Sequence, residues 1–206
     1  MVEKTFKLPF SCVGTGHVVY KQCLYCHKMF TNKIVKYSLK DNMGLGDIQL
    51  ENSGVHDSFP YQFGKHSDLD FAIDEKGLWL IYATNSSKGH IKISKINEET
   101  FSLDKQSTHV TEIKKNQVGN AFMICGVLYA TNAYDEVPTY IKYMFDTNTQ
   151  RTTVLEPGQL PFRNSLGGQY ARVYALDYSP SDKALYSWNN GRVEIFPVSF
   201  VDDSEP

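Results

Sequence analysis

The sequence lacks an excess of charge of either sign, and this absence excludes several classes of protein. Lysine and arginine together number 21 and aspartate and glutamate 23, so the formal net charge is −2. A protein whose main partner is a nucleic acid needs a basic face, so this balance argues against nucleic-acid binding. Charged residues make up 21% of the chain, too ordinary a share for a wholly disordered polypeptide.

The chain also lacks a long apolar run. A membrane-spanning helix needs about 20 predominantly apolar residues, so we expect no membrane insertion. The first five residues, MVEKT, lack the apolar core of a secretory signal. We therefore expect either a cytosolic protein or a piece of a longer protein whose signal lies upstream.

Helical periodicity is nearly absent, whereas aromatic residues are abundant. The 13 Tyr, 12 Phe and two Trp make up 13% of the chain, and such enrichment favours β structure. The one short helix that we expect lies at residues 97–100. Residues 202–206 are expected to form a frayed acidic tail. A length of 206 residues fits one domain.

A short strand–turn–strand unit recurs four times along the chain. Its second strand contains a leucine followed by an aromatic residue, at intervals of 54, 50 and 57 residues, in the pairs Leu24–Tyr25, Leu78–Trp79, Leu128–Tyr129 and Leu185–Tyr186. Turn residues separate the two strands, as at Glu75-Lys-Gly and Pro180-Ser-Asp. A self-similar β unit with a period of about 50 residues predicts an all-β propeller with one blade per repeat. Sandwiches and barrels rank second because they usually lack this longer period.

The positions eight residues before each repeated leucine suggest a binding site. They are Gly16, Asp70, Asn120 and Asp177. Equivalent positions on the innermost strands of a propeller converge on its axis. Two carboxylates there repel each other unless a cation lies between them, and hard oxygen ligands favour Ca²⁺. The alternative is that each residue caps its own hairpin turn and faces water.

Seven segments, spread in order over nearly the whole chain, together resemble an olfactomedin domain. They are GTGHVVY at 14–20, NKIVKY at 32–37, SDLDFAIDE at 67–75, GLWLIYAT at 77–84, NAFMICGVLY at 120–129, LDY at 176–178 and KALYSWNNG at 183–191. Within that family, residues 8–20 are most similar to the gliomedin and olfactomedin-like group.

The resemblance implies a five-bladed propeller in a secreted, extracellular protein. Such a protein serves recognition and adhesion by binding extracellular or cell-surface proteins, and it is not an enzyme. The resemblance also implies a central Ca²⁺ site, whose ligand positions fall on the side chains of Asp70, Asn120 and Asp177 and on the carbonyls of Ala121 and Leu176. Family members can hold a second, monovalent ion such as Na⁺, and Asp177 matches the residue that bridges the two ions.

The family pattern differs from this chain in two places. It begins some tens of residues earlier, with a cysteine that pairs with the one matching Cys125. We therefore expect residues 1–206 to form one olfactomedin-like domain that lacks its N-terminal part and contains an incomplete fifth blade. We expect oligomerisation to use segments outside this chain. Relatives usually carry a small residue and a tyrosine at the positions of Cys23 and Cys26.

The string CLYCH at 23–27 matches the c-type haem attachment motif, and its first four residues match a redox CxxC. Residues three apart on a strand point to opposite faces, so we expect neither haem nor redox chemistry. No second Cys/His pair follows at zinc-finger spacing. We expect one of the two sulfurs to pack between blades and the other to be exposed. A disulfide that involves Cys12 fits an oxidising compartment, and the three full pairings of the four cysteines stay open.

Three further features have simple alternatives. The sequon at Asn85 lies in an expected loop and is a glycosylation candidate, although such triplets also arise by chance. A carboxylate cluster would suit a propeller-type glycoside hydrolase, but a metal ligand plus turn carboxylates explains it more simply; its members are Asp68, Asp70, Asp74 and Glu75. The six histidines show no HxH or HExxH arrangement, so each is expected to be a surface or packing residue.

Overall fold

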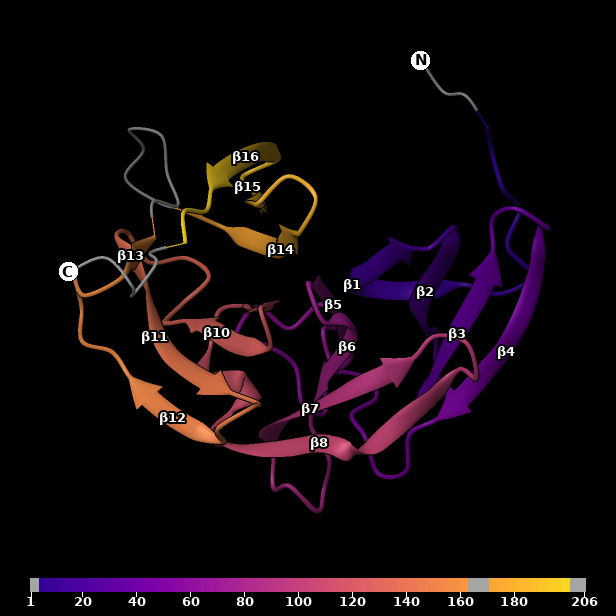
Figure 1. Ribbon diagram of the computed structural model, residues 1–206, viewed down its shortest axis with the longest axis horizontal. Coiled ribbons are helices and arrows are strands. Elements are labelled where there is room, and N and C mark those ends of the chain that lie inside the picture. The colour runs from indigo at the N-terminus through magenta and orange to yellow at the C-terminus, as the bar shows by residue number, and fades with distance from the viewer. Residues whose placement is uncertain (1–3, 163–170, 201–206) are drawn as a thin grey trace.

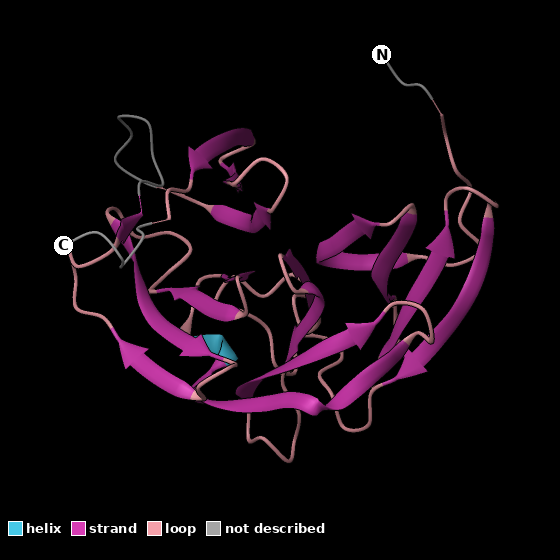
Figure 2. Ribbon diagram, in the orientation of Figure 1, coloured by secondary structure: helices cyan, strands magenta, loops and turns pink. Residues whose placement is uncertain are grey.

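The computed structural model describes residues 4–162 and 171–200, which are built almost entirely of β-strands (Figures 1 and 2). The strands form four antiparallel sheets, which we call blades 1 to 4 in chain order. Blade 1 contains β1 (Cys12–Tyr20), β2 (Cys23–Lys28), β3 (Lys33–Ser38) and β4 (Met43–Gln49). Blade 2 contains β5 (Asp70–Asp74), β6 (Gly77–Tyr82), β7 (His90–Asn97) and β8 (Ser102–Lys114). Blade 3 contains β9 (Ala121–Ile124), β10 (Val127–Thr131), β11 (Thr139–Asp146) and β12 (Arg151–Val154), with β13 (Pro161–Phe162) paired to β11. Blade 4 contains β14 (Val173–Ser179), β15 (Ala184–Asn189) and β16 (Arg192–Pro197).

The four sheets are arranged as the blades of a propeller. Within each blade the strands follow chain order from the inside outwards, and the first strands, β1, β5, β9 and β14, contact one another around the centre. In Figure 1 the strands β4, β8 and β12 run along the outside of the molecule. The prediction of an all-β propeller with one blade per repeat is therefore confirmed. A fifth sheet does not occur within residues 4–162 and 171–200.

The repeated leucine–aromatic pairs all fall on the second strand of a blade, namely β2, β6, β10 and β15. A second strand has a neighbouring strand on each side, so its side chains are available for packing between blades. Leu78 and Leu128 are fully buried, and Trp79 is 2% exposed. The period of the sequence thus marks the second strand of each blade.

The hydrophobic core consists of three clusters, each between two adjacent blades. Tyr25 and Phe71 belong to the cluster between blades 1 and 2. Trp79 and Met123 belong to the cluster between blades 2 and 3, and Leu185 to that between blades 3 and 4. No blade covers its own apolar faces, so the blades stabilise one another in series.

The helix expected at residues 97–100 is wrong. Strand β7 ends at Asn97, whose side-chain oxygen accepts hydrogen bonds from the backbone N–H groups of Glu99 and Thr100, each at 3.0 Å. Asparagine often closes a turn in this way, and here the turn leads into β8. The described residues contain a single short 3₁₀ turn, Lys115–Gln117 (Figure 2), and no helix long and apolar enough to cross a membrane. The expected tail at 202–206 lies outside the described residues.

Candidate metal centre

The four register positions lie on the innermost strands or directly before them, as the propeller prediction requires. Gly16 is in β1, Asp70 begins β5, Asn120 directly precedes β9, and Asp177 is in β14. A side chain added at Gly16 would collide with the Cα atom and the carboxylate of Asp70. Glycine at this position therefore allows blade 1 to pass close to the carboxylate of blade 2.

Asp70 is a buried carboxylate with one strong partner. Its Oδ2 accepts a hydrogen bond of 2.6 Å from the hydroxyl of Tyr61, and only 9% of the residue is exposed. Burial raises the pKa of Asp70, and the charge of Lys115 and the hydrogen bond from Tyr61 partly oppose that rise. The carboxylate is thus held in a place that disfavours its charge.

Lys115 supplies a positive charge that acts on this carboxylate. Its side chain is fully buried, its Nζ donates to the carbonyl of Ser67, and the same nitrogen lies 3.2 Å from the centroid of the Tyr61 ring. Burial lowers the pKa of Lys115 to about 7, although the charges of Asp70 and Asp68 act in the opposite direction. A single ammonium group with so low a pKa compensates the nearby carboxylates only in part.

Asp177 supplies the second carboxylate at the centre. Burial, followed by the charge of Asp70, raises the pKa of Asp177 to about 8. The pKa of Tyr61 is also raised, first by burial and then by Asp70 and Asp177, while hydrogen bonding to the backbone of Ala121 opposes the rise. Tyr61 therefore interacts with three of the predicted ligand residues, Asp70, Asp177 and Ala121.

Asn120 connects blade 3 to blade 4. Its backbone N–H donates to Thr131 Oγ1 at 2.9 Å, and its side-chain Nδ2 donates to the carbonyl of Val173 at 2.8 Å. Because the amide nitrogen is bound to β14, the amide oxygen lies on the opposite side of the planar group. The predicted carbonyl ligands are their neighbours in the chain: Ala121 follows Asn120, and Leu176 precedes Asp177. Each is 3% exposed.

The donor set fits a hard divalent cation. The interacting groups at the centre are the carboxylates of Asp70 and Asp177 and the buried ammonium of Lys115, whose charge acts on Asp70. Carboxylate, amide and carbonyl oxygens are the ligands that Ca²⁺ prefers. Three or more His, Cys, Asp or Glu side chains do not gather into a metal cluster anywhere in the described part of the chain. Amide and carbonyl oxygens are thus needed to complete a shell here.

The carboxylates proposed for a glycosidase are bound to separate structural partners. Asp68 is fully buried and accepts hydrogen bonds of 2.8 and 2.7 Å from two backbone N–H groups of the preceding loop. Asp70 and Asp74 lie at opposite ends of β5. Asp74 accepts a hydrogen bond of 2.7 Å from the indole nitrogen of Trp79. Each of these carboxylates therefore has its own structural partner.

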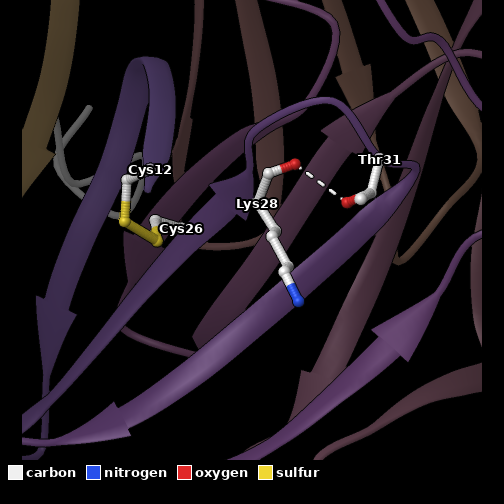
Figure 3. The surroundings of a disulfide bond; sticks show 4 residues. All are labelled: Cys12, Cys26, Lys28 and Thr31. Atoms are coloured by element: carbon white, nitrogen blue, oxygen red, sulfur yellow. Dashed lines mark hydrogen bonds between the residues drawn. A yellow bond between two sulfur atoms is a disulfide. The ribbon is translucent and has the colours of Figure 1, made fainter. Parts of the chain in front are cut away.

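The cysteines form one disulfide, between Cys12 of β1 and Cys26 of β2 (Figure 3). Cys23 and Cys125 carry free thiols, half-buried and exposed respectively. Cys23 packs against the cluster between blades 1 and 2, whereas Cys26 is fully buried in the disulfide. The predicted disulfide of Cys12 is confirmed. The expectation that one of Cys23 and Cys26 is exposed is wrong, because Cys26 is buried by its disulfide and Cys23 is half-buried.

Two residues of the site were not identified from the sequence. Tyr61 and Lys115 lie in the loop before β5 and in the 3₁₀ turn after β8, outside the repeated unit. A lysine in a turn is ordinarily exposed, so the sequence gave no indication that Lys115 would be buried at the site. The sequon residue Asn85, in contrast, is exposed in the turn between β6 and β7, as expected from the sequence.

Four sheets around a centre that carries buried oxygen ligands define this chain as a β-propeller with a candidate cation site. A family model for the olfactomedin-like domain matches residues 1–203, and the chain belongs to that family.

Two solved structures are similar to the chain at low identity. The computationally designed Ika4 protein is 14% identical, with a TM-score of 0.46 over 97% of this chain and 100% of that chain. The β-propeller domain of Cps50 (Swd1) from Myceliophteria thermophila is 8% identical, with a TM-score of 0.46 over 86% of this chain and 51% of that chain.

Proposed function

We propose that this domain is a non-catalytic extracellular recognition module whose propeller is stabilised by a central Ca²⁺ ion. The observation that carries the proposal is a pair of acidic side chains on the inner strands, the buried Asp70 and the half-buried Asp177, whose charges repel each other. A buried like-charge pair is costly unless a cation compensates it. Membership of the olfactomedin-like family supports the recognition role.

Five residues would hold the ion. The side chains of Asp70, Asn120 and Asp177 supply oxygen ligands, and Ala121 and Leu176 supply carbonyls. Bound Ca²⁺ supplies two positive charges, which would neutralise both carboxylates and connect blades 2, 3 and 4. Asp177 would bridge this ion to a second, monovalent ion such as Na⁺. With its inner strands fixed, the propeller presents its loops and blade faces to extracellular or cell-surface proteins.

Two features support secretion. Disulfides such as Cys12–Cys26 persist in oxidising compartments and are rare in the cytosol. The sequon residue Asn85 is exposed, which glycosylation requires.

The glycoside hydrolase alternative has weaker support. It needs two carboxylates that share a cleft and remain available to a substrate. Asp74 is bound to Trp79, and Asp68 is bound to the backbone of its own loop. Hydrolysis of a glycoside panel that disappears in Asp74→Asn would favour this alternative over the recognition role.

Thermal unfolding in Ca²⁺ and in excess chelator tests the metal proposal. Binding to the native state stabilises it by about 2.7 kcal/mol when free Ca²⁺ is about 100 times Kd. We expect the wild type to melt at a higher temperature in Ca²⁺, and Asp177→Asn to melt at the same temperature in both conditions. The exposed-carboxylate control Glu99→Gln should respond like the wild type. An equal midpoint for the wild type in Ca²⁺ and chelator overturns the proposal.

A further inference from the structure

Three of the six histidines line one small pocket on blade 1. Its potential ligands are imidazole nitrogens, whereas the propeller centre offers oxygen ligands. The pocket has a volume of about 80 Å³ and lies between the β1–β2 hairpin and the loop that leads from β4 to β5. We call it the histidine pocket, and it is lined by Val13, His27, Met29, Phe30, Val55, His56 and His66. Nothing in the spacing of these histidines along the sequence indicated that they would meet.

His27 offers an unused nitrogen to this pocket. Its Nε2 lies 2.6 Å from the carbonyl oxygen of Thr31, and because a carbonyl only accepts hydrogen bonds, Nε2 carries the proton. Nδ1 therefore holds a lone pair. Nδ1 is buried without a hydrogen-bond partner, and the whole residue is 3% exposed. A histidine that served packing alone would normally have both of its buried nitrogens satisfied.

His66 has the complementary arrangement. Its Nδ1 lies 4.0 Å from Oδ2 of Asp57, and the Asp57 carboxylate also accepts a hydrogen bond from the backbone N–H of His66. At this distance the carboxylate is an ion-pair neighbour of the ring rather than a hydrogen-bond acceptor, and a nearby carboxylate of this kind favours metal binding by the imidazole. The remaining nitrogen, Nε2, is the one available to a metal ion.

The loop that carries His66 is fixed to the blade. Its Asp57 N–H donates to the buried carboxylate of Asp68 at 2.8 Å. Gly14 of β1 lies against the carbonyl of His66 with a φ of +87°, and a side chain at this glycine would collide with that carbonyl. The two imidazoles are therefore held on the same pocket by separate elements of the fold.

We propose that the histidine pocket is a transition-metal site that binds Zn²⁺ or a similar borderline ion through His27 Nδ1 and His66 Nε2. Neutral imidazole nitrogens suit zinc, copper and nickel, whereas the propeller centre offers only hard oxygen ligands. The described residues hold no ready cluster of three His, Cys, Asp or Glu side chains, and the proposal uses two histidines. Water and the thioether of Met29 are available for its remaining positions.

The entrance to the pocket is formed by exposed side chains. Phe30 is 73% exposed, and the side chain of His66 is 47% exposed. The ring of His56 stacks on Phe30 with centroids 5.5 Å apart. A metal ion can therefore exchange at this site through movement of surface side chains, without opening of the blade.

The test is a calorimetric titration. Protein that is saturated with Ca²⁺ is titrated with Zn²⁺ alone. We expect one saturable site in the wild type. His66→Ala should weaken Zn²⁺ binding by at least tenfold, and Asp57→Asn by about 10–100-fold as removal of an outer-shell carboxylate usually does. His17→Ala, which removes an exposed histidine of β1 outside the pocket, should leave the affinity unchanged.

Two further measurements separate binding from folding and from the Ca²⁺ site. Imidazole ¹⁵N spectra should show a Zn²⁺-induced shift of Nδ1 in His27 and of Nε2 in His66, which a purely structural role would not produce. Zn²⁺ binding should persist in Asp177→Asn, so failure of the Ca²⁺ proposal leaves this one intact. Unchanged affinity in a folded His66→Ala, or equal loss in His17→Ala, overturns the site.

Discussion

The hydroxyl of Tyr178 in β14 donates a hydrogen bond of 2.7 Å to Oε1 of Glu75, in the turn between β5 and β6. Oε2 of the same carboxylate accepts a hydrogen bond of 2.9 Å from the backbone N–H of Cys125, in the turn between β9 and β10. One acidic side chain thus connects blades 2, 3 and 4. Burial raises the pKa of Glu75, but these hydrogen bonds outweigh burial, and the pKa lies below its usual value.

A double-mutant cycle should detect this connection between blades. Tyr178→Phe removes the hydroxyl donor, and Glu75→Gln removes the charge of the acceptor. Because Glu75 is an exposed residue, we expect each change to cost about 1 kcal/mol and the pair to couple by about 0.5–1 kcal/mol in urea unfolding. Strictly additive losses of unfolding free energy would contradict a direct interaction.

Cys125 should react slowly with maleimide although it is exposed. Its Sγ lies 3.3 Å from Oε2 of Glu75, and burial followed by Glu75 raises the pKa of the thiol. Only the thiolate is nucleophilic, so we expect Glu75→Gln to accelerate labelling at pH 7.5. The measurement uses a Cys23→Ser background, in which Cys125 is the remaining free thiol. Equal rates with and without Glu75 would show that this carboxylate does not control the thiol.

The metal-free protein should lose stability as the pH rises towards 8. The pKa of Asp177 is raised from 3.8 to about 8 in the folded chain, by burial first and then by Asp70. Between these values the folded state binds more protons than the unfolded state, so the free energy of unfolding falls with increasing pH. The stabilising contribution is fully present below pH 3.8 and is lost by about pH 8.

Comparison with Asp177→Asn in excess chelator isolates this contribution. The variant removes the titrating group. The free energy of unfolding of the wild type should therefore fall relative to that of the variant as the pH rises from 5 to 8. Near pH 8 we expect metal-free Asp177→Asn to be the more stable protein. A wild type that gains stability relative to the variant over this range would show that Asp177 ionises normally.

The disulfide should contribute to folding stability through blade 1. Cys12 and Cys26 are 14 residues apart, and closure of a loop of about 15 residues stabilises a chain by about 3 kcal/mol in the chain-entropy description. We expect Cys26→Ser to lower the free energy of unfolding, measured in urea, by a similar amount. Cys23→Ser should have a much smaller effect. Peptide mapping should find the Cys12–Cys26 bond; a Cys23 disulfide instead would contradict the assignment.

Much of the fold followed from one sequence feature. The leucine–aromatic pairs predicted the second strand of every blade, because side chains packed between blades are constrained at each repeat. The same register placed Asp70, Asn120 and Asp177 on the inner strands or directly before them. Counting eight residues back from the leucine of a second strand reaches the first strand of the same blade. Local turn chemistry misled at Asn97, where an acidic run resembled a helix start but the asparagine side chain closes a turn.

Features outside the repeat were not predictable in the same way. Lys115, Tyr61 and the histidine pocket depend on where irregular loops fold back on the blades, and no period in the sequence reports that. The pairing of Cys12 with Cys26 likewise needed the register of β1 against β2, which places their Cα atoms 5.8 Å apart. Sequence spacing alone allowed three pairings.

Replacement of Lys115 by methionine should be strongly destabilising. Its ammonium group is fully buried, donates to the carbonyl of Ser67, and opposes the charges of Asp70 and Asp68. Removal of one partner from a buried charge arrangement leaves the others uncompensated, which typically costs about 3–5 kcal/mol. We expect a loss of this order for Lys115→Met in chelator, measured by urea unfolding.

The neighbouring residue provides a matched control for this prediction. Lys114 is exposed, so Lys114→Met should change the free energy of unfolding by no more than about 0.5 kcal/mol. Saturating Ca²⁺ should reduce the loss in Lys115→Met, because the ion would compensate Asp70 in place of the ammonium. A loss that is equal in Ca²⁺ and chelator would mean that Lys115 acts through Tyr61 and Ser67 rather than through the carboxylates.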